Sequence, residues 1–195
     1  LQRGDAWADG IYNYFEPAFT ADGGVIIEKI RYAGEATEFS NYLQTAEDLV
    51  ADAIAEYGVE HVGFEIISFS ESVVMVTQAV DYPSIYSVTW FGSDGTTLSQ
   101  QHCDDAPEQT VNVRLHSTYA APAESEKFAD LYDRYFALVS QPFGYYSACS
   151  YDIGWIITES ILNSQSTDAT VLIPIQADTG FNNFGASGWN RLNAA

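Results

Sequence analysis

Apolar and polar positions follow two repeats along the chain, one typical of helices and one typical of strands. Apolar residues at helical spacing predict a helix over residues 11–19, with Asp5 as a cap before it and Pro17 as a kink or an end. Further helices are predicted over residues 40–57, 70–80, 96–102, 128–138 and 145–162. Strands are predicted over residues 25–30, 60–67, 86–91 and 110–115.

Strands and helices alternate in this order, which indicates βαβ units. We therefore expect an α/β fold with a doubly wound, mainly parallel sheet that carries helices on both faces. Only helices are predicted after the last strand, so the C-terminal portion is expected to be helical. Leu1 falls at the end of a strand whose body is missing, and no initiating Met precedes it, so the chain looks like a piece of a longer protein.

The chain is strongly acidic, with 27 Asp and Glu against 7 Lys and Arg and a formal net charge of −20. Such a surface repels phosphate backbones and anionic lipids, so we expect neither a nucleic acid nor a membrane surface as a partner. Hydrophobic residues make up 47% of the chain and charged residues only 17%, which argues against disorder and allows a sizeable core. The negative charge is consistent with an acidic surface that keeps the protein soluble, or with a protein that works outside the cell at high salt concentration.

No segment reaches the roughly 18 uncharged apolar residues that a membrane-spanning helix needs. The two cysteines, Cys103 and Cys149, are too few for a disulfide scaffold and too far apart for a zinc motif. Two unpaired thiols are favoured over a single bridge.

The predicted topology also locates a ligand site, because ligands of open α/β sheets bind beyond the carboxyl ends of the strands. Four loops converge at that edge, residues 4–10, 32–39, 68–71 and 92–96. Their candidate binding residues are Trp7, Ser68, Phe69, Ser70 and Asp94. Together they offer an aromatic wall, hydroxyl groups at a helix start and one carboxylate, which suits a small polar ligand.

Each candidate group has a defined chemical role in this hypothesis. Asp94 would pair with a ligand ammonium group, Trp7 would add a cation–π contact, and the helix start at Ser70 would receive a carboxylate or carbonyl. The structural alternatives stay open. Asp94 stands in an ordinary turn sequence, Trp7 can pack between helices, and Ser70 can serve only as a cap.

Catalysis is the main alternative class, represented by a small α/β hydrolase. The chain has no Gly-x-Ser-x-Gly elbow, no His-Glu-x-x-His motif and no glycine-rich phosphate loop, and none of its three histidines forms a convincing pair with a nucleophile. Residues 102–105, His-Cys-Asp-Asp, suggest a metal cluster only weakly, because adjacent residues rarely point at one ion. We therefore expect no enzyme activity, no metal and no cofactor.

Several stretches of the sequence resemble the type I periplasmic binding proteins, and specifically the branched-chain amino-acid and amide receptors of ABC importers. The likeness covers nearly the whole chain, and it rests on the order and spacing of its parts rather than on one diagnostic motif. The most specific match is Trp90-Phe91-Gly92-Ser93-Asp94-Gly95-Thr96. The other matching stretches are residues 3–10, 32–43, 62–71, 82–83, 145–155 and 185–188.

The resemblance implies a protein of two α/β lobes that close on a ligand across a hinge. Residues 1–120 then correspond to lobe two, and residues 121–195 to a helical crossover with part of lobe one or the hinge. Trp7 and Asp94 fall where amino-acid receptors of the family place an aromatic wall and the acid that holds the ligand's amino group, and Phe69 falls near a further aromatic contact.

The same resemblance implies partners and a location. The protein would bind a small molecule such as an amino acid or an amide, act with the membrane permease of an ABC transporter, and lie outside the cell or in the periplasm, anchored to the membrane in its full-length form. A ligand-sensing receptor ectodomain is the alternative, since it has the same fold. Apolar surface after about residue 140, left without a second lobe, also predicts a homodimer.

Overall fold

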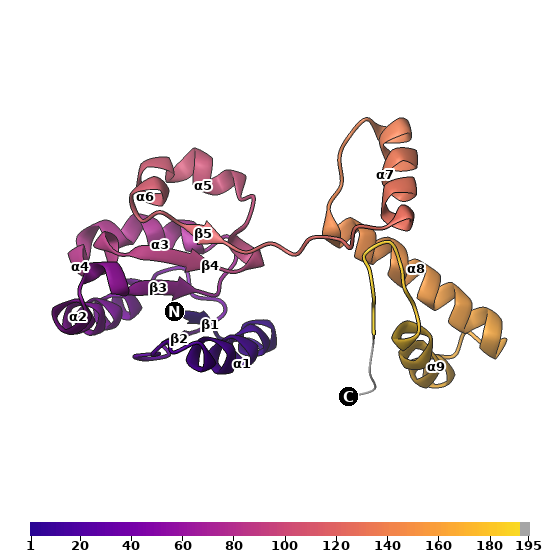
Figure 1. The fold of residues 1–195 in the computed structure, drawn as a ribbon, viewed down its shortest axis with the longest axis horizontal. Coiled ribbons are helices and arrows are strands. Elements are labelled where there is room, and N and C mark those ends of the chain that lie inside the picture. Colours follow the sequence, from indigo (N-terminus) through magenta and orange to yellow (C-terminus); the bar gives the residue numbers. More distant parts are fainter. Residues whose placement is uncertain (192–195) are drawn as a thin grey trace. The chain divides into compact units, whose positions relative to one another are not determined.

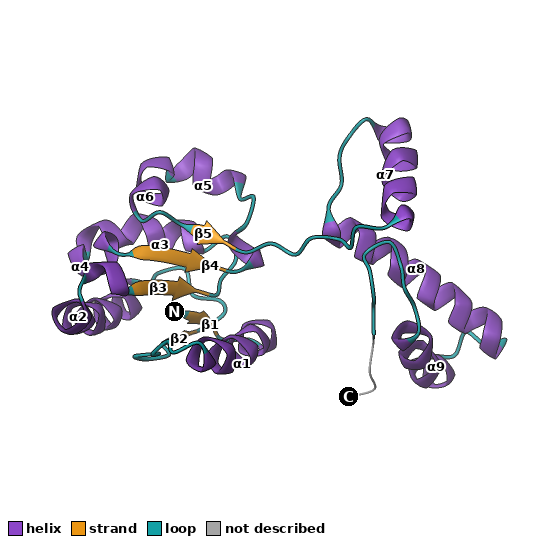
Figure 2. Ribbon diagram, in the orientation of Figure 1, coloured by secondary structure: helices purple, strands orange, loops and turns teal. Residues whose placement is uncertain are grey.

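The computed structural model describes residues 1–191 of the 195-residue chain. The chain divides into two compact units, Leu1–Tyr119 and Ala120–Ala195, called unit 1 and unit 2 below. Unit 1 is a mixed α/β structure, whereas unit 2 is mainly helical (Figure 2). The α/β class and the helical C-terminal portion are therefore as predicted.

A parallel sheet forms the centre of unit 1 (Figure 1). Its first two strands are joined to the other three by a parallel bridge between Gln2 and Ile67, where the Arg3 amide donates to the Ile67 carbonyl at 2.9 Å. The order across the sheet is β2-β1-β3-β4-β5, which is a doubly wound order. The strands are β1 (Gln2–Arg3), β2 (Arg31–Tyr32), β3 (Gly63–Ile66), β4 (Thr89–Gly92) and β5 (His116–Ser117).

Helices connect successive strands of this sheet. Right-handed crossovers in this strand order place α1 on one face and the helices from α2 onwards on the other. Short 3-10 turns separate some of them, at Val59–His61, Ala79–Asp81 and Asp94–Thr96. The helices of unit 1 are α1 (Ala6–Ala21), α2 (Ser40–Tyr57), α3 (Ser72–Gln78), α4 (Pro83–Ser87), α5 (Gln100–Asp105) and α6 (Pro107–Asn112).

The main core of unit 1 packs α2, α3 and α4 against the sheet. Leu43, Met75 and Trp90 are fully buried there, with the Trp90 indole N–H donating to the Ile85 carbonyl at 2.7 Å. Burial of these side chains stabilises the fold by roughly 1.5–3 kcal/mol each relative to exposure. The core thus fixes β3 and β4, whose carboxyl ends carry the loops of the candidate site.

Two of the predicted strands are wrong. Residues 25–30 have no strand pairing, although the Ile30 carbonyl accepts from the Gln2 amide at 2.8 Å, and the strand itself begins at Arg31. Residues 107–112 form α6, because Pro107 is preset for the first turn of a helix, and the strand follows only at His116. A short apolar run is compatible with a strand or a helix, and the tertiary contacts of the segment determine which one forms.

The caps of the first helix agree with the sequence. Asp5 precedes α1 and its carboxylate accepts a hydrogen bond from the Ala8 amide at 3.0 Å, as predicted. The helix continues past Pro17 to Ala21, so the proline does not end it. Pro17 lies in the last turns, where the loss of one hydrogen bond affects little of the helix.

Glu47 on α2 acts as a cap for a different helix. Its carboxylate accepts hydrogen bonds from the Ser84 amide at 2.9 Å and the Ile85 amide at 3.0 Å, at the start of α4. We expect Glu47→Ala to lower the free energy of unfolding by about 1–2 kcal/mol, the usual effect of losing a cap. Urea denaturation measures this, with the exposed Glu56→Ala on the same helix as the control. Equal stability of the two variants would contradict the capping role.

Up to residue 191, unit 2 contains three helices, α7 (Glu126–Val139), α8 (Tyr145–Ser164) and α9 (Ala169–Phe181), followed by an antiparallel bridge between Phe184 and Trp189. Helices α8 and α9 pack against each other. Asp152 on α8 is buried and fixes the segment after α9. Its carboxylate accepts hydrogen bonds from the amides of Ala186 and Ser187, each at 2.8 Å, and from the Ser187 hydroxyl at 2.6 Å.

Candidate functional site

The carboxyl edge of the sheet carries an aromatic stack. Trp7, in the first turn of α1, and Phe69, in the loop after β3, stack with ring centroids 4.1 Å apart and an interplanar angle of 20°. The Phe69 side chain remains 40% exposed. Two residues that the sequence places 62 positions apart therefore form one aromatic surface at the edge where ligands of such sheets bind.

Gly95 lies directly beneath this stack. A Cβ atom at this position would approach the Phe69 ring to 2.8 Å and the Trp7 ring to 3.0 Å, and it would collide with the Ser68 carbonyl. The absence of a side chain thus lets the loop after β4 pass close to both rings. Hydroxyl groups hold this loop in place, since Thr96 bonds to Ser117 at 2.7 Å.

A charged network borders the aromatic stack. Arg3 at the end of β1 donates to Asp5 and to Glu71, each at 2.7 Å, and its guanidinium carbon lies 5.5 Å from the centre of the Phe69 ring. Tyr32 at the end of β2 donates its hydroxyl to Glu71 at 2.7 Å. The ends of β1 and β2 and the loop after β3 are therefore connected through polar side chains.

The network keeps its carboxylates charged. Burial raises the pKa of Glu71, but the hydrogen bonds from Tyr32 and Arg3 outweigh it and leave that pKa below its usual value. The Ala8 amide, with a smaller contribution from Arg3, lowers the pKa of Asp5. Burial and the neighbouring Glu71 raise the pKa of the Tyr32 phenol, so it stays a hydrogen-bond donor.

The hydroxyl and carboxylate candidates occupy different environments at this edge. Ser68 is fully buried, and Ser93, which precedes Asp94, is nearly so. Neither serine hydroxyl oxygen has a hydrogen-bond partner among residues 1–191. Asp94 is half-buried and begins the 3-10 turn after β4. Buried hydroxyls without a partner are uncommon, so both offer unused hydrogen-bonding capacity, Ser68 after β3 and Ser93 after β4.

The position of Ser70 differs from the expectation. Helix α3 begins at Ser72, and its N-cap residue is Glu71, so the prediction that Ser70 caps this helix is wrong. Ser70 is exposed in the preceding turn, where its carbonyl accepts from the Val73 amide at 3.2 Å. The turn, rather than a capping side chain, sets where the helix starts.

His102 takes part in a buried polar cluster behind the Phe69 loop. Its two ring nitrogens lie 2.7 Å from the Ser72 hydroxyl and 3.0 Å from the Thr110 hydroxyl. Both nitrogens are therefore engaged, which leaves none for the metal cluster considered at residues 102–105. Cys103 and Cys149 are free thiols in the described chain and belong to different units, so the pair of unpaired thiols stays a prediction.

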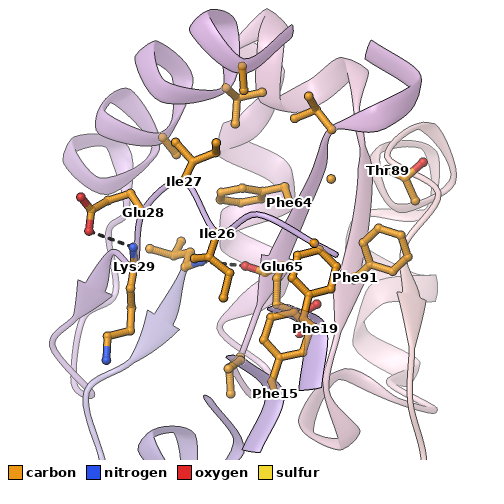
Figure 3. Close-up of a pocket in the computed structure, with 18 of the residues that line it drawn as sticks. Phe15, Phe19, Ile26, Ile27, Glu28, Lys29, Phe64, Glu65, Thr89 and Phe91 are labelled. Carbon is orange, nitrogen blue, oxygen red and sulfur yellow. Dashed lines mark hydrogen bonds between the residues drawn. The ribbon is translucent and has the colours of Figure 1, made fainter. Parts of the chain in front are cut away.

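A cavity of about 910 Å³ is lined by α1, by residues 23–30 and by the side of α2 that faces the sheet (Figure 3). Phe15 and Phe19 of α1 and Phe91 of β4 gather there beside Glu65. Burial raises the pKa of the Glu65 carboxyl to about 7. None of the five candidate residues lines this cavity, so the aromatic stack and the cavity are separate features of unit 1.

Sequence reasoning missed three residues of the carboxyl edge, namely Arg3, Glu71 and Gly95. Arg3 and Glu71 follow adjacent strands, so a pair of opposite charges at two strand ends was a usable signal. The role of Gly95 had no such signal, because a glycine in a turn is expected whether or not side chains pack over it. The cavity was missed too, since its residues come from distant segments.

Comparison with known proteins identifies the fold. No protein-family model matches the chain. The leucine-binding protein LivK of Thermotoga maritima superposes with a TM-score of 0.63 and 18% identity, over 95% of this chain and 49% of that one. The chain has the type I periplasmic-binding-protein fold. The resemblance seen in the sequence is thus confirmed at the level of the fold.

Two further structures share the type I periplasmic-binding-protein fold with this chain. A solute-binding protein of an ABC transporter from R. palustris, in complex with benzoate, has a TM-score of 0.58 and 13% identity, over 95% of this chain and 48% of that one. An ABC transporter substrate-binding protein from Desulfitobacterium hafniense has a TM-score of 0.58 and 17% identity, over 99% of this chain and 53% of that one. The chain spans about half the length of these structures.

A curated relative exists as well. Uncharacterized protein MJ1266 of Methanocaldococcus jannaschii is 30% identical over 118 residues, which is 60% of this chain and 27% of that protein. Among residues 1–191, no helix is both long and apolar enough to cross a membrane, and no group of three or more metal-binding side chains is placed to hold an ion.

Proposed function

We propose that the chain is part of an extracellular or periplasmic solute-binding receptor that holds a small polar metabolite, such as an amino acid or an amide, at the carboxyl edge of its sheet. The observation that carries this proposal is the stack of Trp7 on Phe69 over Gly95, at the edge where this fold class binds ligands. The three structures that share the fold are named as binding proteins, which supports binding without chemistry.

In this proposal, different residues at the carboxyl edge of the sheet contact different parts of the ligand. The aromatic stack provides a flat apolar surface for the body of the ligand, and a cation over its face gains a cation–π contact. Asp94, at the start of the turn after β4, pairs with a ligand ammonium group in this proposal. Ser68 contributes a hydroxyl that has no partner among the described residues, and Ser70 contributes an exposed one.

Calorimetry in the full-length protein tests the proposal, with leucine, other amino acids, their amides and benzoate as the ligand panel. We expect an amine-bearing member to bind the wild type, and Asp94→Ala to bind it at least about tenfold more weakly, since a charge-assisted hydrogen bond contributes roughly 1.5–3 kcal/mol. Trp7→Ala should weaken binding of the same ligand by a similar factor, because the aromatic surface is lost.

Two exposed residues of unit 1 provide matched controls. Asp105→Ala removes an acid from the end of α5, and Tyr14→Ala removes an aromatic ring from α1 that is 84% exposed. Both variants should bind like the wild type. If amine-bearing ligands bind wild type and Asp94→Ala equally well, the role given to Asp94 is wrong, and turnover of a panel member would favour the enzyme alternative.

The other parts of the proposal follow from the same fold. The two-lobed receptor would trap its ligand between lobes, with unit 1 as lobe two and unit 2 as crossover material of the other lobe. A membrane permease of an ABC transporter would read the closed state, and a membrane anchor would hold the receptor near it. A homodimer stays a prediction, as does the alternative of a signalling ectodomain.

A further inference from the structure

A chain of buried hydrogen bonds lies directly behind the loop that carries Phe69. The Ser72 hydroxyl lies 2.7 Å from both the Phe69 carbonyl and Nε2 of His102, and Nδ1 of His102 lies 3.0 Å from the Thr110 hydroxyl. Ser72 is fully buried and His102 is 4% exposed. The cluster joins α3, α5 and α6 to the turn before α3.

Counting protons fixes the direction of every bond in this cluster. Ser72 has one hydroxyl proton, and the Phe69 carbonyl can only accept, so that proton goes to Phe69. The Ser72 oxygen must then accept from His102, which places the ring proton on Nε2. Nδ1 is left as an acceptor, and the Thr110 hydroxyl donates to it.

The burial of the His102 ring is consistent with a neutral imidazole that carries its proton on Nε2. Burial lowers the pKa of His102, so the neutral ring with one acceptor nitrogen is the form that persists near pH 7. In the reverse tautomer, Nε2 would need the Ser72 proton, and the Phe69 carbonyl would lose its bond to that hydroxyl.

Phe69 depends on its backbone for a fixed position. The residue is 40% exposed, and its ring stacks on Trp7 with the Arg3 guanidinium nearby. Its carbonyl receives two hydrogen bonds, from the Ser72 hydroxyl at 2.7 Å and from the Ser72 amide at 3.1 Å. The shorter of the two is the one that His102 directs.

We propose that His102 is a positioning residue of the ligand site, which holds the Ser72 hydroxyl on the Phe69 carbonyl and so keeps the Phe69 ring stacked on Trp7. The proposal rests on the proposed function for its meaning in ligand binding, but the positioning itself is a property of the ligand-free chain. We call the bonded series Thr110–His102–Ser72–Phe69 the relay. Thr110 belongs to it because its hydroxyl holds the His102 ring in the tautomer that donates to Ser72.

Nitrogen-15 NMR of the ligand-free protein tests the relay without any variant. We expect the His102 ring to show the shifts of a neutral imidazole with its proton on Nε2 at pH 7. A ring protonated on Nδ1 overturns the proposal, and so does a ring that carries both protons at that pH. This outcome does not depend on whether a ligand is ever found.

Variants then test whether the relay positions the stack. The indole N–H signal of Trp7, assigned with Trp7→Phe, should move in Ser72→Ala and in His102→Phe, and the double variant should move it no further because both changes break one chain. His102→Gln restores a donor near the position of Nε2, and it should return the signal part of the way.

Two controls separate positioning from general loss of stability. Thr77→Val removes a hydroxyl of α3 that donates to the Val73 carbonyl of its own helix, at 2.8 Å, and Leu43→Ala weakens the core at α2, a helix that contributes no residue to the cluster. Neither should move the Trp7 signal. A shift of equal size in either control, or an unmoved signal in folded Ser72→Ala, overturns the proposal.

Ligand binding adds a final comparison once a panel member is known to bind. Ser72→Ala should bind that member about three- to tenfold more weakly, with His102→Gln closer to the wild type. Unchanged affinity in Ser72→Ala, with the Trp7 signal displaced, overturns the link to ligand binding. If no panel member binds, the proposed function fails while the NMR result on the relay still stands or falls by itself.

Discussion

Replacing Asp152 with alanine is expected to lower the free energy of unfolding of unit 2 by about 3 kcal/mol or more. The buried carboxylate accepts three hydrogen bonds from residues 186 and 187, and its removal leaves two amides without this acceptor and the Ser187 hydroxyl with only a 3.5 Å contact to Asn190. Leaving a buried polar group unsatisfied costs about 1–3 kcal/mol for each group, although relaxation of the segment recovers part of this.

Guanidinium denaturation followed by circular dichroism measures the effect of the Asp152 change, since unit 2 is largely helical. Asp178→Ala on α9 is the matched control, because that side chain is exposed. Asp152→Asn should be intermediate, since its amide keeps one accepting oxygen but turns a donor towards Ser187. A transition in Asp152→Ala that coincides with the wild type would show that the carboxylate does not hold this segment.

The second large effect concerns Glu65, whose pKa is about 7 in the folded chain against 4.5 for an unperturbed glutamate. Between these pH values the unfolded chain releases its proton first, so the stability contributed by this group falls as the pH rises from about 4.5 to about 7. The full loss, reached above pH 7, is about 3 kcal/mol. Desolvation of the carboxylate beside the cavity of Figure 3 is the cause.

Glu65→Gln keeps the shape of the side chain but cannot ionise. We expect the variant to match the wild type near pH 4 and to exceed its free energy of unfolding at pH 8 by up to about 3 kcal/mol. Denaturation at a series of pH values gives this difference directly, with the exposed Glu108→Gln as the control. A constant difference between variant and wild type from pH 4 to pH 8 would contradict the burial of a charged Glu65.

The sequence predicts helices and strands most accurately where the apolar repeat is compatible with only one of them. Helix α2 has a clear apolar face and ends at Gly58, whose φ of +85° suits glycine. The apolar run of residues 25–30 predicts a strand, but the sequence alone does not show whether a partner strand lies beside it. Helix α9 was not predicted, since Pro174 and a nearly uniform apolar composition conceal its repeat.

The candidate site was predictable only to the level of the sheet edge. Strand order alone brings the loops of Trp7 and Phe69 to one side, because carboxyl ends of parallel strands meet there. Whether the two rings touch depends on the backbone of Gly95 passing beneath them, and this is a matter of tertiary packing. The Ser72–His102 contact joins residues 30 positions apart for the same reason.

The place of β1 in the sheet has a consequence for the order of folding. This strand comes first in the sequence, yet it lies between β2 and β3, and its bridge from Gln2 reaches Ile67. The middle of the sheet therefore closes only when Ile67 reaches Gln2, and the segment of more than sixty residues between them must be ordered at that step. Until then the side of β1 that faces β3 is an open strand edge, available for incorrect pairing during folding.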